Sequence, residues 1–98
     1  MNAIVFVVDS ADKERIGDAK MALLTIIGEE ELKSTTLLVL ANKQDSPHAL
    51  SLAQVSDSLG LTSLRGRQWH ICATSAIKGE GITQGFDWLI DAINESAS

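Results

Sequence analysis

The chain has 98 residues, of which 45% are hydrophobic, and it carries a formal net charge of −5. That length suits a single domain with a modest core, and the acidic balance argues against a general nucleic-acid or anionic-membrane surface. One cysteine cannot form an internal disulfide, and no apolar segment approaches the ~20 residues that cross a bilayer, so we expect a cytoplasmic protein.

The first part of the chain predicts a strand followed by a helix. Residues 3–8 are an unbroken apolar run, which is typical of a buried strand. The run Asp9-Ser10-Ala11-Asp12 then supplies oxygens that would cap a helix running to about Ile27, with Gly28 ending it. Asp9 also stands where a catalytic group would, at the carboxyl end of a strand, but we interpret it as a capping residue.

The middle of the chain carries the most specific motif. Residues 36–41 are a short apolar run that predicts a second buried strand, and it ends in Asn42-Lys43-Gln44-Asp45. In open α/β sheets, ligands bind beyond the carboxyl ends of the strands. Guanine presents an N1–H and an exocyclic amine side by side, and the Asp45 carboxylate would accept both hydrogen bonds.

The neighbouring residues of this motif have supporting roles in that interpretation. Asn42 would hold the loop and reach the acceptor edge of the base, while the stem of Lys43 would lie along the face of the ring. The alternative is an exposed turn, because Asn and Asp favour bends in any protein.

A third strand is predicted to begin at Trp69 and to break into the small residues Thr74-Ser75-Ala76. Cys72 lies inside this strand and is interpreted as core packing. Small side chains let a backbone N–H approach a ligand closely, so the N–H of Ala76 would donate to the guanine oxygen. The two motifs follow successive strands, and together they indicate a guanine site more specifically than either motif alone.

Two further helices complete the pattern. Ser51 and Gln54 have the spacing of a capping box for a short helix that ends at Gly60. Asp57-Ser58-Leu59-Gly60 fits the Asp-x-x-Gly formula of a nucleotide switch, but we assign it to the end of this helix. The last helix would begin near Gly81, with a core-facing stripe of Ile82, Phe86, Leu89, Ile90 and Ile93. The predicted fold is therefore α/β, with three parallel strands and three helices.

With these motifs in place, the chain resembles the small GTPases, and within them the ADP-ribosylation-factor (Arf) and Arf-like family. The resemblance covers nearly the whole chain. Its matching segments are Val8 to Asp12, Glu14 to Ile16, Glu30 to Leu32, Ala41 to Asp45, Pro47, Ala49, Leu59 to Leu61, Trp69 and Gly85 to Leu89. Thr-Ser-Ala leading to Lys78, the acidic Glu29-Glu30-Glu31-Leu32, and Ser46 in place of the usual Leu look more like an Arf-like member than a true Arf.

The resemblance implies a partial P-loop-GTPase (Rossmann-like) fold, with residues 1–98 as the carboxyl-terminal part of one truncated domain. It implies GTP or GDP as the nucleotide, and for the complete family protein a role in vesicle trafficking with Golgi or other endomembrane association. The residues implied to bind guanine are Asn42, Lys43, Asp45, Ser75 and Ala76, with Ile77 against the base.

The phosphate half of such a site is not encoded here. The chain has no Gly-x-x-x-x-Gly-Lys-Ser/Thr sequence, so we expect no phosphate-binding lysine, no magnesium site and no catalytic residue. Nucleotide binding by the isolated chain would be weak or absent. His48 and His70 stand apart from cysteines and carboxylates at metal-ligand spacing, so no metal is expected.

An alternative function remains open, namely a truncated, non-catalytic protein that binds a partner or itself. The apolar run from Ala3 to Val8 contains no charge, proline or bulge, and an unpaired strand of this kind is a template for further pairing. Asn2 stands where myristoylation requires glycine, so we expect no direct membrane attachment by this chain.

Overall fold

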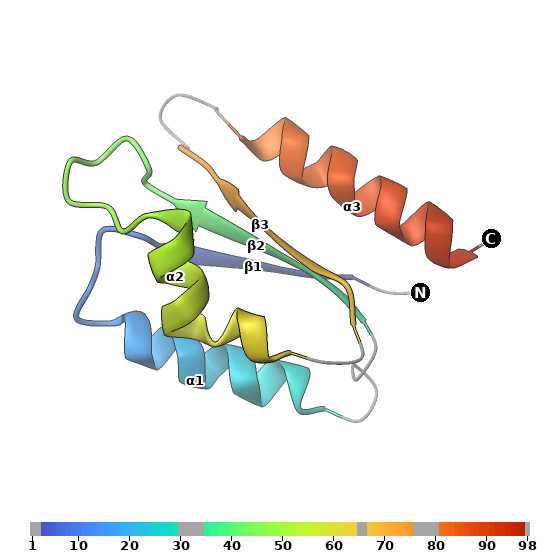
Figure 1. The fold of residues 1–98 in the computed structure, drawn as a ribbon, viewed down its shortest axis with the longest axis horizontal. Coiled ribbons are helices and arrows are strands. Elements are labelled where there is room, and N and C mark those ends of the chain that lie inside the picture. The colour runs from blue at the N-terminus through green and yellow to red at the C-terminus, as the bar shows by residue number, and fades with distance from the viewer. Residues whose placement is uncertain (1–2, 30–34, 65–66, 76–80, 98) are drawn as a thin grey trace.

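The computed structural model describes residues 3–29, 35–64, 67–75 and 81–97. Strands and helices alternate along the chain (Figure 1). Their bounds are β1 (Ala3–Asp9), α1 (Ile16–Ile27), β2 (Thr36–Asn42), α2 (Leu52–Leu59), a 3₁₀ turn (Leu61–Ser63), β3 (Trp69–Ala73) and α3 (Ile82–Ala97).

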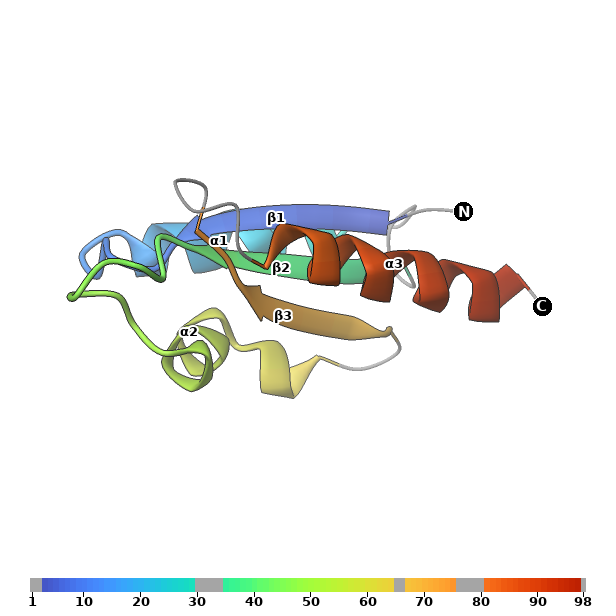
Figure 2. The same cartoon turned by 90° about the horizontal axis from the view of Figure 1, so that it is seen from above.

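The described strands form one parallel sheet in the order β1-β2-β3. Helices α1 and α2 cover one face of this sheet and α3 covers the other (Figures 1 and 2). The α/β class with three parallel strands and three helices is therefore confirmed. Because the strands are parallel, their carboxyl ends lie along one edge, which is where the predicted base motifs follow the strands.

The central strand β2 is buried on both faces, since alternate side chains of a strand point to opposite sides. Leu37 and Val39 face α1 and α2, where they pack with Leu23 of α1 and Val55 of α2. Leu38 and Leu40 of β2 face α3 instead, where they form a second cluster with Cys72 of β3 and Leu89 of α3. Cys72 is thus a core residue, as predicted, and its burial raises the pKa of the thiol.

The start of α1 differs from the prediction. The helix begins at Ile16 behind Arg15, and no side chain caps it. The Asp9 carboxylate is used elsewhere, because it accepts the N–H of Ala11 at 2.9 Å and the Nζ of Lys43, also at 2.9 Å. The oxygens of Asp9, which the sequence pattern assigned to a helix cap, therefore accept hydrogen bonds from a local turn and from an ion pair instead.

Helix α2 agrees with the prediction at both ends. The Ser51 hydroxyl accepts the N–H of Gln54 at 3.2 Å, and the Gln54 side chain accepts the N–H of Ser51 at 2.9 Å. Gly60 ends the helix with φ 74°, a left-handed conformation that suits glycine. Asp57 therefore lies in the last turn of a surface helix.

The predicted core-facing stripe of α3 is only partly correct. Gly85, Leu89 and Ala92 are buried against the sheet, whereas Phe86 and Ile90 are exposed. Gly85 explains the rotation of the helix, because a Cβ there would lie 3.2 Å from Cδ2 of Leu40. The glycine lets α3 approach the sheet closely and turns its larger neighbours outward.

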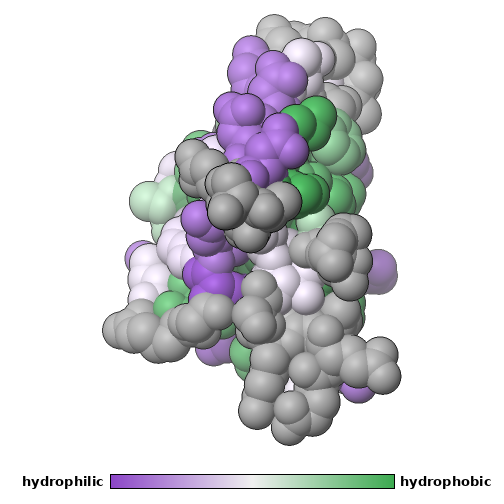
Figure 3. Space-filling view, turned by 90° about the vertical axis from the view of Figure 1, so that its right-hand side faces the viewer, coloured by the Kyte–Doolittle hydropathy of each residue, from purple (hydrophilic) through white to green (hydrophobic). Residues whose placement is uncertain are grey.

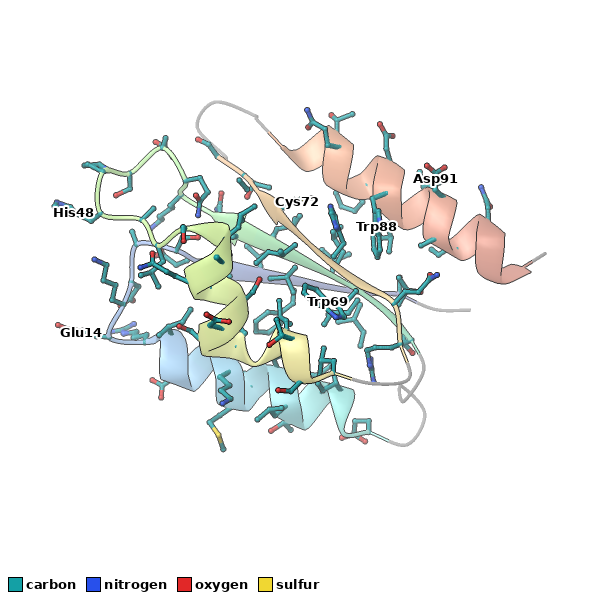
Figure 4. The ribbon with its side chains drawn as sticks, in the orientation of Figure 1. Glu14, His48, Trp69, Cys72, Trp88 and Asp91 are labelled. Carbon is teal, nitrogen blue, oxygen red and sulfur yellow. The ribbon has the colours of Figure 1, made fainter. Side chains whose placement is uncertain are left out.

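Trp88 packs beside this contact. Its ring stacks on His70 of β3, with the ring centroids 4.9 Å apart. Figure 4 shows Trp88 pointing from α3 toward the sheet. His70 is accordingly a packing residue of the strand.

Candidate functional site

The candidate site lies just beyond the ends of β2 and β3, where backbone hydrogen bonds continue past the strands. The N–H of Thr74 donates to the carbonyl of Ala41 at 3.0 Å, and the N–H of Gln44 donates to the carbonyl of Thr74 at 3.0 Å. On the other side, the N–H of Ser10 donates to the carbonyl of Asn42 at 3.1 Å. The loops that carry the two motifs are therefore held to each other and to β1.

Asp45 and Ser75 meet at this edge, although 30 positions separate them in the sequence. The Ser75 hydroxyl donates to Oδ1 of Asp45 at 2.9 Å. Ser75 is only 2% exposed, whereas Asp45 is exposed. Since each carboxylate oxygen has two lone pairs, the bond from Ser75 orients the carboxylate and leaves acceptor capacity directed outward.

Asn42 and Thr74 make a second link between the two strand ends. The Thr74 hydroxyl donates to Oδ1 of Asn42 at 3.2 Å, and Thr74 is buried. This contact agrees with the expectation that Asn42 holds the loop.

The backbone of Lys43 adopts a left-handed conformation, which is unusual for a residue other than glycine. With φ 61° it is the one non-glycine residue with positive φ among the described ranges. Its Nζ donates to Oδ2 of Asp9 at 2.9 Å, and this hydrogen bond is the main cause that lowers the pKa of Asp9 and raises the pKa of Lys43. In this left-handed conformation, the side chain of Lys43 points toward the end of β1.

Gln44, the third residue of the Asn42–Asp45 motif, holds the loop through two side-chain hydrogen bonds. Its Nε2 donates to the hydroxyl of Ser10 at 2.8 Å and to the carbonyl of Leu50 at 3.0 Å. The N–H of Leu50 in turn donates to the carbonyl of the fully buried Ser10 at 2.8 Å. The sequence interpretation gave Gln44 no role of its own and treated Ser10 as part of a helix cap, because no local spacing predicts that these two residues pair.

Gly81 holds the start of α3 against the end of β3. It has φ 81°, and a Cβ at this position would overlap the carbonyl oxygen of Ala73 and lie 2.9 Å from its carbonyl carbon. This close approach lies directly beside Thr74 and Ser75. Ala76 and Ile77, which were also predicted to contact the base, lie outside the described residues.

A surface hollow of about 570 Å³ adjoins the end of β1. Its lining includes Asp9, Asp12 and Glu14 together with Lys13 and His48. Figure 4 shows Glu14 and His48 on the loops at this end of the molecule. A lining with more carboxylates than cations does not suit a phosphate group. Within the described ranges, no cluster of at least three His, Cys, Asp or Glu residues is placed to hold a metal ion.

Three parallel strands with helices on both faces are consistent with a partial P-loop GTPase fold. The model of the ADP-ribosylation factor family matches residues 1–93, and the chain belongs to this family. It is also similar to ADP-ribosylation factor-like protein 1 of Saccharomyces cerevisiae, with 57% identity over 93 residues. That match covers 95% of this chain and 51% of the yeast protein, so the chain spans about half the length of this relative. No helix in the described ranges is long and apolar enough to cross a membrane.

Proposed function

We propose that the chain is the guanine-recognition part of an Arf-like small GTPase domain. The observation that carries this proposal is the Asp45 carboxylate, oriented at the carboxyl end of the sheet by the hydroxyl of the buried Ser75. A carboxylate fixed in this way is preorganised to accept the N1–H and the exocyclic amine of guanine together. Adenine has no such pair of donors on that edge, so it would leave the carboxylate unmatched.

The other site residues have supporting roles in this proposal. Asn42 holds the loop through Thr74, and the stem of Lys43 forms one wall for the ring. Ala76 and Ile77 lie outside the described residues, and the family resemblance is what proposes them as further contacts to the guanine oxygen and the base. In the complete family protein, the same surface would bind GTP or GDP during vesicle trafficking at the Golgi or another endomembrane.

The proposal is tested by titrating the isolated chain with guanosine, GDP and ADP, by calorimetry and by amide chemical shifts in NMR. We expect weak binding of GDP, and affinity for GDP at least about tenfold above that for ADP, because a base site with matched donors rejects an analogue that lacks them. Guanosine should bind nearly as well as GDP, since the chain encodes no phosphate-binding loop. Equal affinity for GDP and ADP would contradict guanine recognition.

We also propose that the isolated chain does not hydrolyse GTP. Phosphoryl transfer depends on a lysine and on magnesium ligands that position the phosphates and neutralise their charge, and the chain lacks the Gly-Lys-Ser/Thr sequence that supplies them. A single-turnover assay with purified chain should give the same phosphate release with and without magnesium. Magnesium-dependent release above a no-protein blank would overturn this expectation.

A second function, self-association, is favoured by a different observation. Val5 and Val7 on β1 are exposed apolar side chains, and β1 is an edge of the described sheet. Residues 3–8 of β1 carry no charge, and a strand edge without charge pairs readily with another strand. We therefore propose, as the alternative function, a truncated, non-catalytic protein that binds a partner or self-associates.

A further inference from the structure

Gln44 is held by hydrogen bonds on three sides. Its backbone N–H donates to the carbonyl of Thr74 at 3.0 Å, just beyond the end of β3. Its side-chain Nε2 donates to the hydroxyl of Ser10 at 2.8 Å and to the carbonyl of Leu50 at 3.0 Å. Both Nε2 hydrogens are therefore used inside the protein, so the side-chain amide has no donor left for a ligand.

Ser10 is a firmly held partner for this amide. It is fully buried directly after β1, its N–H donates to the carbonyl of Asn42 at 3.1 Å, and its carbonyl accepts the N–H of Leu50 at 2.8 Å. Figure 1 shows the segments that follow β1 and β2 at the same end of the sheet. A buried hydroxyl that loses its hydrogen bond is costly, so Ser10 and Gln44 hold each other in place.

Gln44 also stands in the middle of residues 42–45, which are called the base loop below. It lies between Lys43, whose backbone has φ 61°, and Asp45. The Asp45 side chain is exposed, and the Ser75 hydroxyl holds it through Oδ1. Consecutive Cα atoms are about 3.8 Å apart across a rigid peptide plane, so any displacement of Gln44 moves the Asp45 backbone with it. The aim of the Asp45 carboxylate therefore depends on how Gln44 is anchored.

A second side-chain link between β1 and the base loop is weaker. The Nζ of Lys43 donates to Oδ2 of Asp9 at 2.9 Å, but the two side chains are 60% and 39% exposed. Exposed ion pairs contribute little, because water screens the charges and the side chains lose freedom. The bond from Gln44 to the buried Ser10 is therefore the main side-chain tie between the base loop and β1.

We propose that Gln44 is a positioning residue of the guanine site, whose side chain fixes the base loop on Ser10 and Leu50 so that the Asp45 carboxylate is aimed at the base. This inference rests on the proposed guanine recognition and adds a specificity-determining residue that does not contact the nucleotide. A carboxylate meets two adjacent donors only when it is held within about 0.5 Å of the productive geometry. A base loop freed from Ser10 would still place an acid near the base but would distinguish guanine from adenine poorly.

The first experiment measures the ratio of the affinities for GDP and ADP in the full chain by NMR titration. Gln44→Met keeps the side chain long and unbranched and removes its donors, and we expect the ratio to fall at least about fivefold. Gln68→Met is the matched control, because Gln68 is exposed just before β3, at the other end of the sheet. Figure 3 views that end, where hydrophobic residues already lie beside hydrophilic ones, and this variant should keep the original ratio.

The second experiment separates positioning from stability. Gln44→Met removes the bond to the buried Ser10 hydroxyl, so the melting temperature should fall by at least about 5 °C. Adding Ser10→Ala removes that hydroxyl as well, and replacing both partners by apolar groups should restore most of the loss. The affinity ratio should stay low in this double variant, because no directional side-chain bond then fixes the base loop.

The third experiment needs no nucleotide, because amide hydrogen exchange reports local opening. The N–H groups of Gln44 and Ser46 donate to the carbonyls of Thr74 and Lys43 at 3.0 Å each. Exchange at positions 44 and 46 should be at least about tenfold faster in the double variant than in the original chain. Exchange of Val39, in the buried centre of β2, should change little because the global stability is largely restored.

The outcomes separate this inference from guanine recognition itself. A Gln44→Met chain with the original preference for GDP would overturn positioning by Gln44 and leave guanine recognition in place. Recovery of the ratio together with the melting temperature in the double variant would show that Gln44 acts on stability alone, which also contradicts the inference. Unchanged exchange at positions 44 and 46 would refute the anchoring of the base loop by Gln44. Equal affinity of the original chain for GDP and ADP would instead contradict guanine recognition.

Discussion

Replacing Asp45 with asparagine is expected to change the base preference from guanine to xanthine. Asparagine keeps one acceptor oxygen for the N1–H of the base but presents an amide donor where the second carboxylate oxygen stood. Guanine then meets that donor with its own amine, whereas xanthine has a carbonyl oxygen there. Because a mismatched polar pair loses a hydrogen bond and leaves both groups desolvated, we expect xanthosine diphosphate to bind at least about tenfold more tightly than GDP.

The measurement compares GDP and xanthosine diphosphate on the original chain and on Asp45→Asn, by NMR titration with calorimetry where affinity allows. Asp57→Asn is the matched control, since it makes the same chemical change in an exposed turn of α2 and should leave the preference for GDP intact. An Asp45→Asn chain that still prefers GDP would show that this carboxylate does not read the base.

The second large effect is expected from Gly81→Ala. The added methyl group would collide with the backbone of Ala73, and the alanine would have to adopt φ 81°. Left-handed backbone costs a non-glycine residue about 1–2 kcal/mol, and overpacking adds about 1–3 kcal/mol. We therefore expect a free energy of unfolding lower by about 3 kcal/mol, and a melting temperature lower by at least about 10 °C.

Thermal and urea unfolding followed by circular dichroism would measure this loss. Gly17→Ala is the control, because nothing lies within 4 Å of a Cβ at that position in α1. Removing a helical glycine there should leave stability unchanged or raise it by up to about 1 kcal/mol. If Gly81→Ala melted at or above the temperature of the original chain, the close contact between α3 and the end of β3 would be refuted.

The sequence predicted the elements well where a local pattern determines them. The apolar run of β2 and the capping box of α2 appear at the expected residues, because burial on both faces and the Ser51–Gln54 exchange are properties of the segments themselves. The start of α1 was wrong because Asp9 has a partner, Lys43, that is remote in the sequence. A local sequence pattern cannot show that Lys43 binds the Asp9 carboxylate in place of the end of the helix.

The same distinction applies to the site and to α3. The motif residues Asp45 and Ser75 were predicted to converge, since parallel strands end at one edge, and the structure brings them to 2.9 Å. The bond from Gln44 to the buried Ser10 was not foreseen, because it depends on how the loop folds back over β1. Phe86 and Ile90 were assigned to the core from helical periodicity alone, which carries no information about how far the sheet extends beneath them.

The left-handed backbone of Lys43 has a consequence for how this position would tolerate change. Glycine is the residue that adopts φ 61° without cost, so a chain selected for stability alone would carry glycine here. Lysine keeps its place at an energetic disadvantage of about 1–2 kcal/mol, only partly offset by an exposed ion pair with Asp9. If Lys43 forms the wall of the base site that we propose, stability and base recognition favour different residues at position 43, and a stabilising Lys43→Gly substitution should weaken base binding.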